Sequence, residues 1–355
     1  MFAYLFLPNS GTRVNRFSNS ALPTLIAEFI LIIVLSIFSL HKPSFPGKGR
    51  RLFLNSCSNC KEVPLHPVSL AKLLVVLTFV FSMSFFITDT HPAQAAQPSE
   101  WQAFPAGDVF KPLIADPKEP RFFVSVHNYD NEFKGEFTGA SVGFGENFGI
   151  VKKQLGDQHL WQINLKGGLF SQFDLDTSSK DLLNSDYNIG ITWTYRIEAF
   201  SMRARVYHQS SHLGDEFLIR HPRLADTRTD LDYEAIDWLG AFTWNWFRVY
   251  AGPHYLLDRK PSSLDRWGYH GGIEFLGSGE ILPRGKLIAG LDIKGFQELD
   301  WTPAYSLKAG LSFKNLNYQN RYIQILLEYY NGFIPYGQFY DYDMDSYGLG
   351  VYFGF

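Results

Sequence analysis

The chain has 355 residues with 2 Cys, 8 Trp and a formal net charge of -3 at pH 7, and these totals are unevenly distributed. Both cysteines, Cys57 and Cys60, precede residue 96, whereas every Trp follows it. Residues 1–95 carry 8 Lys or Arg against 3 Asp or Glu, a net of 8 − 3 = +5, which leaves -3 − 5 = -8 for the remaining 260 residues. This acidic, cysteine-free part excludes a disulfide scaffold, a Cys-ligated metal and a cysteine nucleophile, and it disfavours nucleic-acid binding.

Residues 68–95 have the organisation of a secretory signal peptide. One basic residue, Lys72, precedes an apolar run, and the small-residue site Ala93-Gln94-Ala95 follows it. Cleavage after Ala95 would leave residues 96–355 as the mature protein. The alternative is an uncleaved transmembrane helix, which the short apolar run and the A-x-A site disfavour.

Residues 1–67 contain a second apolar stretch, 21–40, which is followed by a basic segment and the Cys57-x-x-Cys60 pair. A signal peptide that begins so far into a chain is unusual, so we interpret 1–67 as a mis-assigned extension upstream of a start codon near Val68. The alternative is a membrane anchor at 21–40. A single C-x-x-C pair without a second pair carries little information, and we assign it no function.

From about residue 121 to the C-terminus, apolar residues recur at every second position, and no helical period is sustained. In 187–195 the odd positions are apolar or aromatic and the even positions are polar or glycine. In 199–209 the even positions are mostly apolar and the odd positions carry polar residues, including Arg203 and Arg205. Each segment therefore has one apolar face and one polar face, as expected of a strand with two different surroundings.

The alternation predicts twelve strands joined by two kinds of connection. The strands span residues 121–128, 137–149, 159–170, 187–196, 199–209, 235–244, 247–256, 267–276, 285–296, 304–313, 321–330 and 346–355. Polar loops such as 171–186 and 211–234 follow the odd-numbered strands. Turns as short as Ile197-Glu198 or Asn245-Trp246 follow the others.

These features predict an all-β fold, an antiparallel transmembrane β-barrel of about 12 strands over 121–355, preceded by a periplasmic segment at 96–120. Strands that are apolar outside and polar inside, aromatics at strand ends, long outer loops and short periplasmic turns are typical of Gram-negative outer-membrane barrels. Phe355 ends the last amphipathic strand, where the outer-membrane insertion machinery is expected to bind. We therefore expect an outer-membrane protein surrounded by membrane lipids. A secreted soluble β-sandwich is the main alternative, because its strands alternate as well.

Two strings, Trp101 to Arg121 and Arg205 to Glu216, resemble the bacterial family catalogued as domain of unknown function 1207. The resemblance covers most of 100–355. It implies an envelope protein and attaches no particular activity to it.

The string from Tyr207 to Glu216 contains the candidate catalytic residues. His208 and Ser210 share the apolar-face parity of their strand, so we expect both to project toward lipid at its outer end. This arrangement resembles two barrel hydrolases, outer-membrane phospholipase A, whose motif likewise reads His-Gln-Ser, and the lipid A 3-O-deacylase. The resemblance implies that Ser210 attacks a lipid ester and that His208 accepts its proton. Glu234 opens the next strand with the same parity and is our first choice for orienting His208.

The sequence departs from both hydrolases after the Ser. They continue with Asn, whereas Ser211-His212 follows here, and they place their third catalytic residue closer to the Ser than Glu234 lies. Asp215 and Glu216 are alternatives, either for orienting the imidazole or for holding Ca²⁺ together with loop carbonyls.

A non-enzymatic interpretation explains the same residues. Polar side chains at a strand end commonly form a hydrogen-bonded base for the following loop. The protein would then be a structural barrel or a small-solute pore, in which Arg203 and Arg205 line a channel or fill a closed lumen.

Overall fold

The computed structural model describes residues 101–354, except 156–157, 223–230 and 315–321. The proposed extension 1–67, the proposed signal peptide 68–95 and Phe355 lie outside the described residues. The strands are β1 (Trp101–Ala103), β2 (Phe122–Asn131), β3 (Gly135–Leu155), β4 (His159–Asp174), β5 (Leu182–Ile197), β6 (Phe200–Leu213), β7 (Asp232–Trp244), β8 (Phe247–Lys260), β9 (Trp267–Leu282), β10 (Gly285–Phe296), β11 (Ala304–Lys314), β12 (Tyr322–Phe333) and β13 (Asp343–Gly354).

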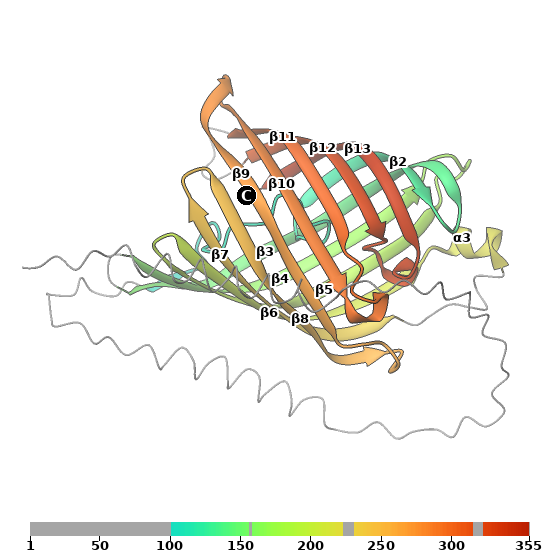
Figure 1. The fold of residues 1–355 in the computed structure, drawn as a ribbon, viewed down its shortest axis with the longest axis horizontal. Coiled ribbons are helices and arrows are strands. Elements are labelled where there is room, and N and C mark those ends of the chain that lie inside the picture. Colours follow the sequence, from blue (N-terminus) through green and yellow to red (C-terminus); the bar gives the residue numbers. More distant parts are fainter. Residues whose placement is uncertain (1–100, 156–157, 223–230, 315–321, 355) are drawn as a thin grey trace, which may run out of the picture. The chain divides into compact units, whose positions relative to one another are not determined.

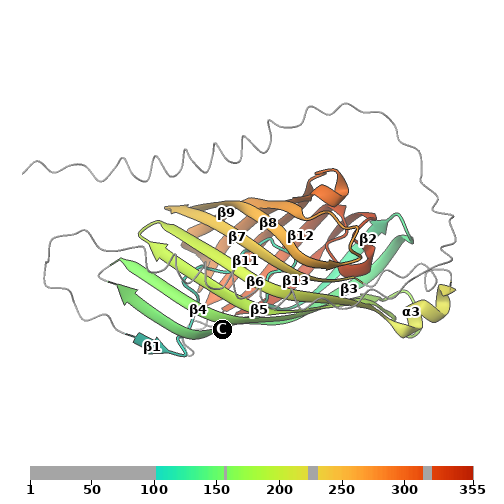
Figure 2. The same ribbon diagram turned by 90° about the horizontal axis from the view of Figure 1, so that it is seen from below.

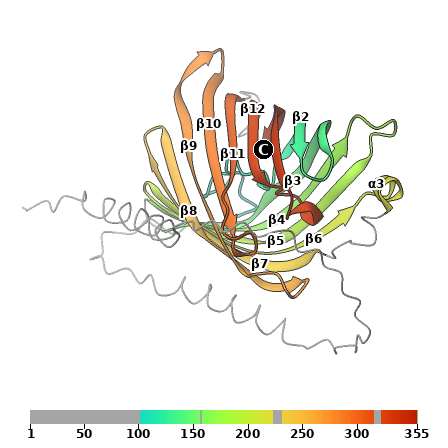
Figure 3. The ribbon, with the colours of Figure 1, turned by 45° about the vertical axis from the view of Figure 1, so that its right-hand side comes forward.

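Strands β2 to β13 form a closed barrel of twelve strands (Figure 1, Figure 3). Each strand pairs antiparallel with its neighbour in the chain, and β13 pairs back onto β2 with Leu349 opposite Val126. Each of the twelve predicted segments overlaps one of these strands, so the predicted all-β barrel is confirmed. The short strand β1 adds to the end of β3, where Trp101 lies opposite Lys153.

Alternate residues of each strand face the exterior and the lumen. In β5, Tyr187, Ile189 and Ile191 are 51%, 58% and 47% exposed, whereas Asn188 and Thr192 are buried in the interior. The same outward exposure recurs around the barrel at Val124, Val126, Phe144, Phe148, Leu165, Trp238, Ile273, Leu287, Leu307, Ile325, Leu327 and Leu349. An apolar surface of this extent is stable in lipid and not in water, and it identifies a transmembrane barrel.

Most of the described connections alternate in kind, as predicted, but the connection between β2 and β3 is a turn of residues 132–134 where a longer polar loop was expected. Glu198-Ala199 and Asn245-Trp246 are tight turns at one end of the barrel. The longer connections at the other end contain the helix α3 (Asp215–Arg220) and the 3-10 helices η1 (Gln297–Leu299) and η2 (Gly337–Phe339). Figure 2 shows α3 beyond this end of the strands. Among the described residues, no helix has the length and hydropathy of a membrane span.

Strands β4 and β5 extend into the region that the sequence predicted as a polar loop. Residues 171–174 and 182–186 pair in the sheet, and only 175–181 connect them. Ser171 and Ser185 face the lumen and share a hydrogen bond of 2.7 Å. The predicted loop was too long because strand residues that face a polar lumen are polar, as loop residues are.

Residues 107–121 run through the inside of the barrel, although the sequence had suggested a periplasmic location for 96–120. Phe104, by contrast, is 69% exposed and donates its N–H to the Ile150 carbonyl of β3. Leu113 and Ala115 are fully buried, and Glu119 is 1% exposed. Glu119 forms a bidentate contact of 3.0 Å with Arg203 of β6. We call residues 107–121 the plug. The sequence could not place its charged residues in the lumen, because their partners lie on strands that are distant in the chain and the spacing within the plug does not indicate them.

One plug residue predicts a dependence of stability on pH. Burial and the neighbouring Glu119 carboxylate raise the pKa of Asp108 to about 7, and its Oδ1 has no hydrogen-bond partner among the described residues. A carboxyl whose pKa is raised by folding binds its proton more tightly in the native state, so the free energy of unfolding falls as the pH rises from the ordinary pKa of 3.8 to about 7 and levels off above it. We expect Asp108→Asn to flatten the fall in melting temperature between about pH 5 and pH 8. Thermal unfolding in detergent at both pH values measures this, and an unchanged slope would contradict it.

Candidate functional site

The candidate catalytic residues lie on the outer wall of the barrel, near the end of β6. Gln209 and Ser211 are 4% and 1% exposed and face the lumen. His208, Ser210 and His212, which alternate with them, therefore face outward. Because β6 leads into the long connection that contains α3, these three side chains lie toward the long-loop end of the barrel.

Strand β7 brings two carboxylates beside His208. Glu234 lies directly opposite His208 in the register, and Asp232 lies opposite Ser210. The Nδ1 atom of His208 is 3.2 Å from Glu234 Oε1 and 3.7 Å from Asp232 Oδ1. All three side chains are more than a third exposed, so the group is open to a molecule approaching from the lipid side.

Ser210 is paired with a different histidine. Its Oγ is 2.9 Å from Nε2 of His212, and the described contacts include no hydrogen bond between Ser210 and His208. Tyr187 of β5 packs edge-on against the His212 ring at a centroid distance of 5.6 Å. The structure thus places the three predicted residues on one face and joins His208 to Glu234, while Ser210 contacts His212.

Two members of this cluster were missed in the sequence. His212 follows Ser210 with the same two-residue spacing as His208 precedes it, and Asp232 has the same parity as Glu234. The sequence shows both spacings. Only the pairing register between β6 and β7, however, puts Asp232 opposite Ser210. One group among the described residues has ligand atoms close enough to share a metal ion. It consists of His208, Asp232 and Glu234, whose nitrogen and oxygen atoms lie within 4.8 Å of one another.

Asp215 and Glu216, the residues considered for Ca²⁺, lie in the first turn of α3. Both are exposed, and neither belongs to the group around His208. Phe217, the next residue, is buried against Phe339 of η2 with ring centroids 5.6 Å apart. The packing of Phe217 anchors this helix on the long-loop end.

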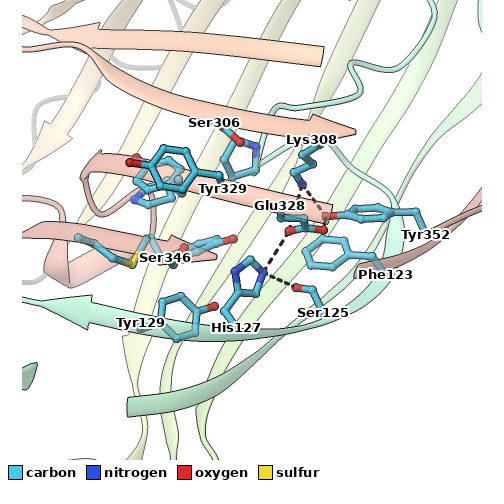
Figure 4. A pocket seen from close by; sticks show the side chains of 15 residues that line it. Phe123, Ser125, His127, Tyr129, Ser306, Lys308, Glu328, Tyr329, Ser346 and Tyr352 are labelled. Carbon is cyan, nitrogen blue, oxygen red and sulfur yellow. Dashed lines mark hydrogen bonds and ion pairs between the residues drawn. The ribbon is translucent and has the colours of Figure 1, made fainter. Parts of the chain in front are cut away.

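A polar network occupies the lumen near β2 and β12 (Figure 4). Nε2 of His127 contacts Ser125 Oγ at 3.1 Å and Glu328 Oε2 at 3.0 Å. Tyr352 donates its hydroxyl hydrogen to Glu328, and Lys308 lies 3.8 Å from the same carboxylate. These groups line a pocket with about 380 Å³ of space that is free of atoms and partly open to solvent. The charges compensate one another within the wall.

Arg203 and Arg205, which were expected either to line a channel or to fill a closed lumen, lie among the side chains that fill the lumen. Arg203 contacts Glu119 of the plug, and Arg205 contacts Asp237 through Nε at 2.8 and 3.0 Å. Lys166 is 2% exposed and lies over the Tyr207 ring at 4.3 Å from its centroid. The polar residues thus solvate one another inside the barrel.

Solved structures to which this chain is similar include two outer-membrane phospholipases and an autotransporter translocator domain. Outer membrane phospholipase A from Escherichia coli is 11% identical, with a TM-score of 0.45 over 67% of this chain and 93% of that chain. The calcium-bound outer membrane phospholipase dimer from Salmonella typhi is 11% identical, with a TM-score of 0.43 over 67% and 94%. The translocator domain of the autotransporter NalP from Neisseria meningitidis is 13% identical, with a TM-score of 0.33 over 81% and 97%.

A search among proteins of curated function gave no match. The model of the family described as "Protein of unknown function (DUF1207)" matches residues 87–355. This match covers the entire barrel and the plug, and the chain belongs to that family.

Proposed function

We propose that the protein is an outer-membrane lipid ester hydrolase whose reacting groups lie on the outer wall of the barrel. The observation that carries the proposal is the contact of 3.2 Å between His208 and Glu234, on the outward face that also bears Ser210. A histidine held by a carboxylate beside a serine is the arrangement that activates a serine hydroxyl. The apolar exterior supports a membrane location, and the expected signal peptide supports export to the outer membrane.

In the proposed reaction, Ser210 Oγ attacks the carbonyl carbon of a lipid ester. The imidazole of His208 takes the hydroxyl proton and returns it to the departing alcohol oxygen, and water then releases the fatty acid from the acyl-enzyme. Glu234 accepts a hydrogen bond from Nδ1 of His208, which leaves Nε2 as the proton acceptor and stabilises the imidazolium that forms. The two groups that carry the proton, Ser210 and His208, both lie on β6, and the carboxylate that orients the imidazole lies on β7.

Ser210 must leave His212 for this reaction to proceed. Rotation about its χ1 angle redirects Oγ between neighbours on the same face of the strand, because His208 and His212 lie two residues on either side of it. His212 is the alternative base, since it already contacts Ser210 at 2.9 Å. Variants of the two histidines distinguish these roles.

The substrate class follows from location. The cluster faces outward at the long-loop end, which is the outer-leaflet side of an outer-membrane barrel, so the proposed substrates are ester-linked acyl chains of phospholipid or lipid A. Ca²⁺ held by Asp215, Glu216 and loop carbonyls would supply positive charge near a developing oxyanion. The alternative, a non-enzymatic structural barrel, is supported by the filled lumen.

The first prediction concerns the nucleophile. Ser210→Ala should reduce fatty-acid release from mixed phospholipid and detergent micelles by at least about 10³-fold, because no other group would form the acyl-enzyme. Ser211→Ala is the matched control, since Ser211 is the adjacent serine but faces the lumen and bonds Asp186. We expect this control to keep its activity. A fluorophosphonate probe should label wild-type protein and Ser211→Ala, but not Ser210→Ala.

The second prediction identifies the base. His208→Asn should lower the rate of ester cleavage by about 10²- to 10⁴-fold, and His212→Asn should change it little. Glu234→Gln should act in the same direction as His208→Asn because it removes the group that orients the imidazole. The reverse order of the histidine variants would assign the base to His212. Folded wild-type protein that releases no fatty acid from phospholipid or lipid A, with or without Ca²⁺, would refute the hydrolase.

A further inference from the structure

The plug crosses the lumen as an extended, irregular segment whose backbone is bound by side chains of the barrel wall. Gln162 of β4 accepts a hydrogen bond from the Val109 N–H at 3.0 Å and donates one to the Gly107 carbonyl at 3.1 Å. Glu274 of β9 accepts the Ile114 N–H at 2.6 Å. The wall therefore supplies the partners that buried peptide groups need when they are not in a helix or sheet.

Further wall contacts reach the middle of the plug. Arg248 of β8 donates to the carbonyls of Lys111 and Pro112, each at 2.9 Å. Ser306 of β11 donates to the Ala115 carbonyl at 2.7 Å. Contacts thus come from strands far apart around the barrel, and the plug spans the lumen instead of lying against one side.

Three close ion pairs join the plug to the wall, in addition to the longer contact of 3.6 Å between Glu119 and Arg205. Glu119 pairs with Arg203 at 3.0 Å, Asp116 pairs with Lys294 at 2.5 Å, and Lys118 pairs with Asp186. These six side chains come from the plug and from β6, β10 and β5. We call the three pairs the latch.

The rest of the luminal wall carries its own charge compensation. Arg205 pairs with Asp237, His270 contacts Asp292 at 2.6 Å, and Glu328 is held by His127 and Lys308. These pairs do not need the plug, although Arg205 also lies 3.6 Å from Glu119. If the plug left and water entered, the wall would keep most of its ion pairs. The latch residues and the wall side chains that bind the plug backbone would exchange a protein partner for water.

We infer that residues 107–121 are a gate, which keeps the barrel closed to small hydrophilic solutes while the latch holds and opens an aqueous pore when the latch is broken. Twelve strands enclose a lumen of intermediate width, between small barrels filled by side chains and wide porins. The polar wall would suit water, ions and small neutral solutes once the segment is displaced. This function is independent of ester hydrolysis, since the outer-wall cluster does not face the lumen.

The test uses the full chain in planar lipid bilayers. Wild-type protein should be closed, and the latch variant Asp116→Asn/Lys118→Met/Glu119→Gln should show discrete openings, with at least about a tenfold rise in open probability. Glu328→Gln is the matched control, because it removes one buried luminal carboxylate that pairs only with wall residues. We expect this control to stay closed. If the triple variant does not fold, Glu119→Gln alone is measured in the same way.

A second measurement locates the plug without relying on conductance. A zero-length carbodiimide joins the amine of a lysine to a carboxylate in contact with it, with loss of water. In folded protein it should link Lys294 to Asp116 and Lys118 to Asp186, as identified by mass spectrometry of the digested chain. Absence of both links, a wild-type pore as open as the latch variant, or a folded latch variant that stays closed would each overturn the inference.

Discussion

The structure depends on the requirement that every peptide group of the sheet be hydrogen-bonded while the outer surface faces lipid. A sheet with a free edge would leave unpaired N–H and C=O groups in hydrocarbon, where each costs several kcal/mol. The ladder between β13 and β2 removes that edge. Closure then divides each strand into two environments, so Leu349 and Val126 face outward while Ser125 and Ser346 face the lumen.

Closure creates a second problem inside the barrel. Charged groups such as Arg203 and Glu274 are buried there, and a buried charge is tolerated only when it is paired. Within the wall, Arg205 pairs with Asp237. The plug brings a further partner into the lumen, because Glu119 pairs with Arg203. The lumen is therefore a polar core, in contrast to the apolar core of a soluble protein.

The outer-wall cluster results from the same register. Because β6 and β7 are antiparallel neighbours, His208 and Glu234 meet although 26 residues separate them in the chain. Their polar side chains lie on the outward face, at the end of the barrel where a lipid headgroup region is expected. The hydrolase proposal rests on the placement of a serine and two histidines at that position.

The sequence by itself determined the amphipathic strands, because period-2 alternation is a local pattern that needs no knowledge of distant contacts. Aromatic residues at strand ends and connections that alternate in length favoured a membrane barrel over a soluble sandwich. The sequence also determined that His208 and Ser210 face outward, since parity along β6 decides the face of every side chain. Only the tertiary structure decided that Ser210 contacts His212, that Asp232 lies beside His208, and that the segment before β2 enters the lumen. Those outcomes depend on side-chain rotamers, on the register between strands and on ion pairs such as Glu119 with Arg203, which join residues 84 positions apart. No local pattern in the chain records them.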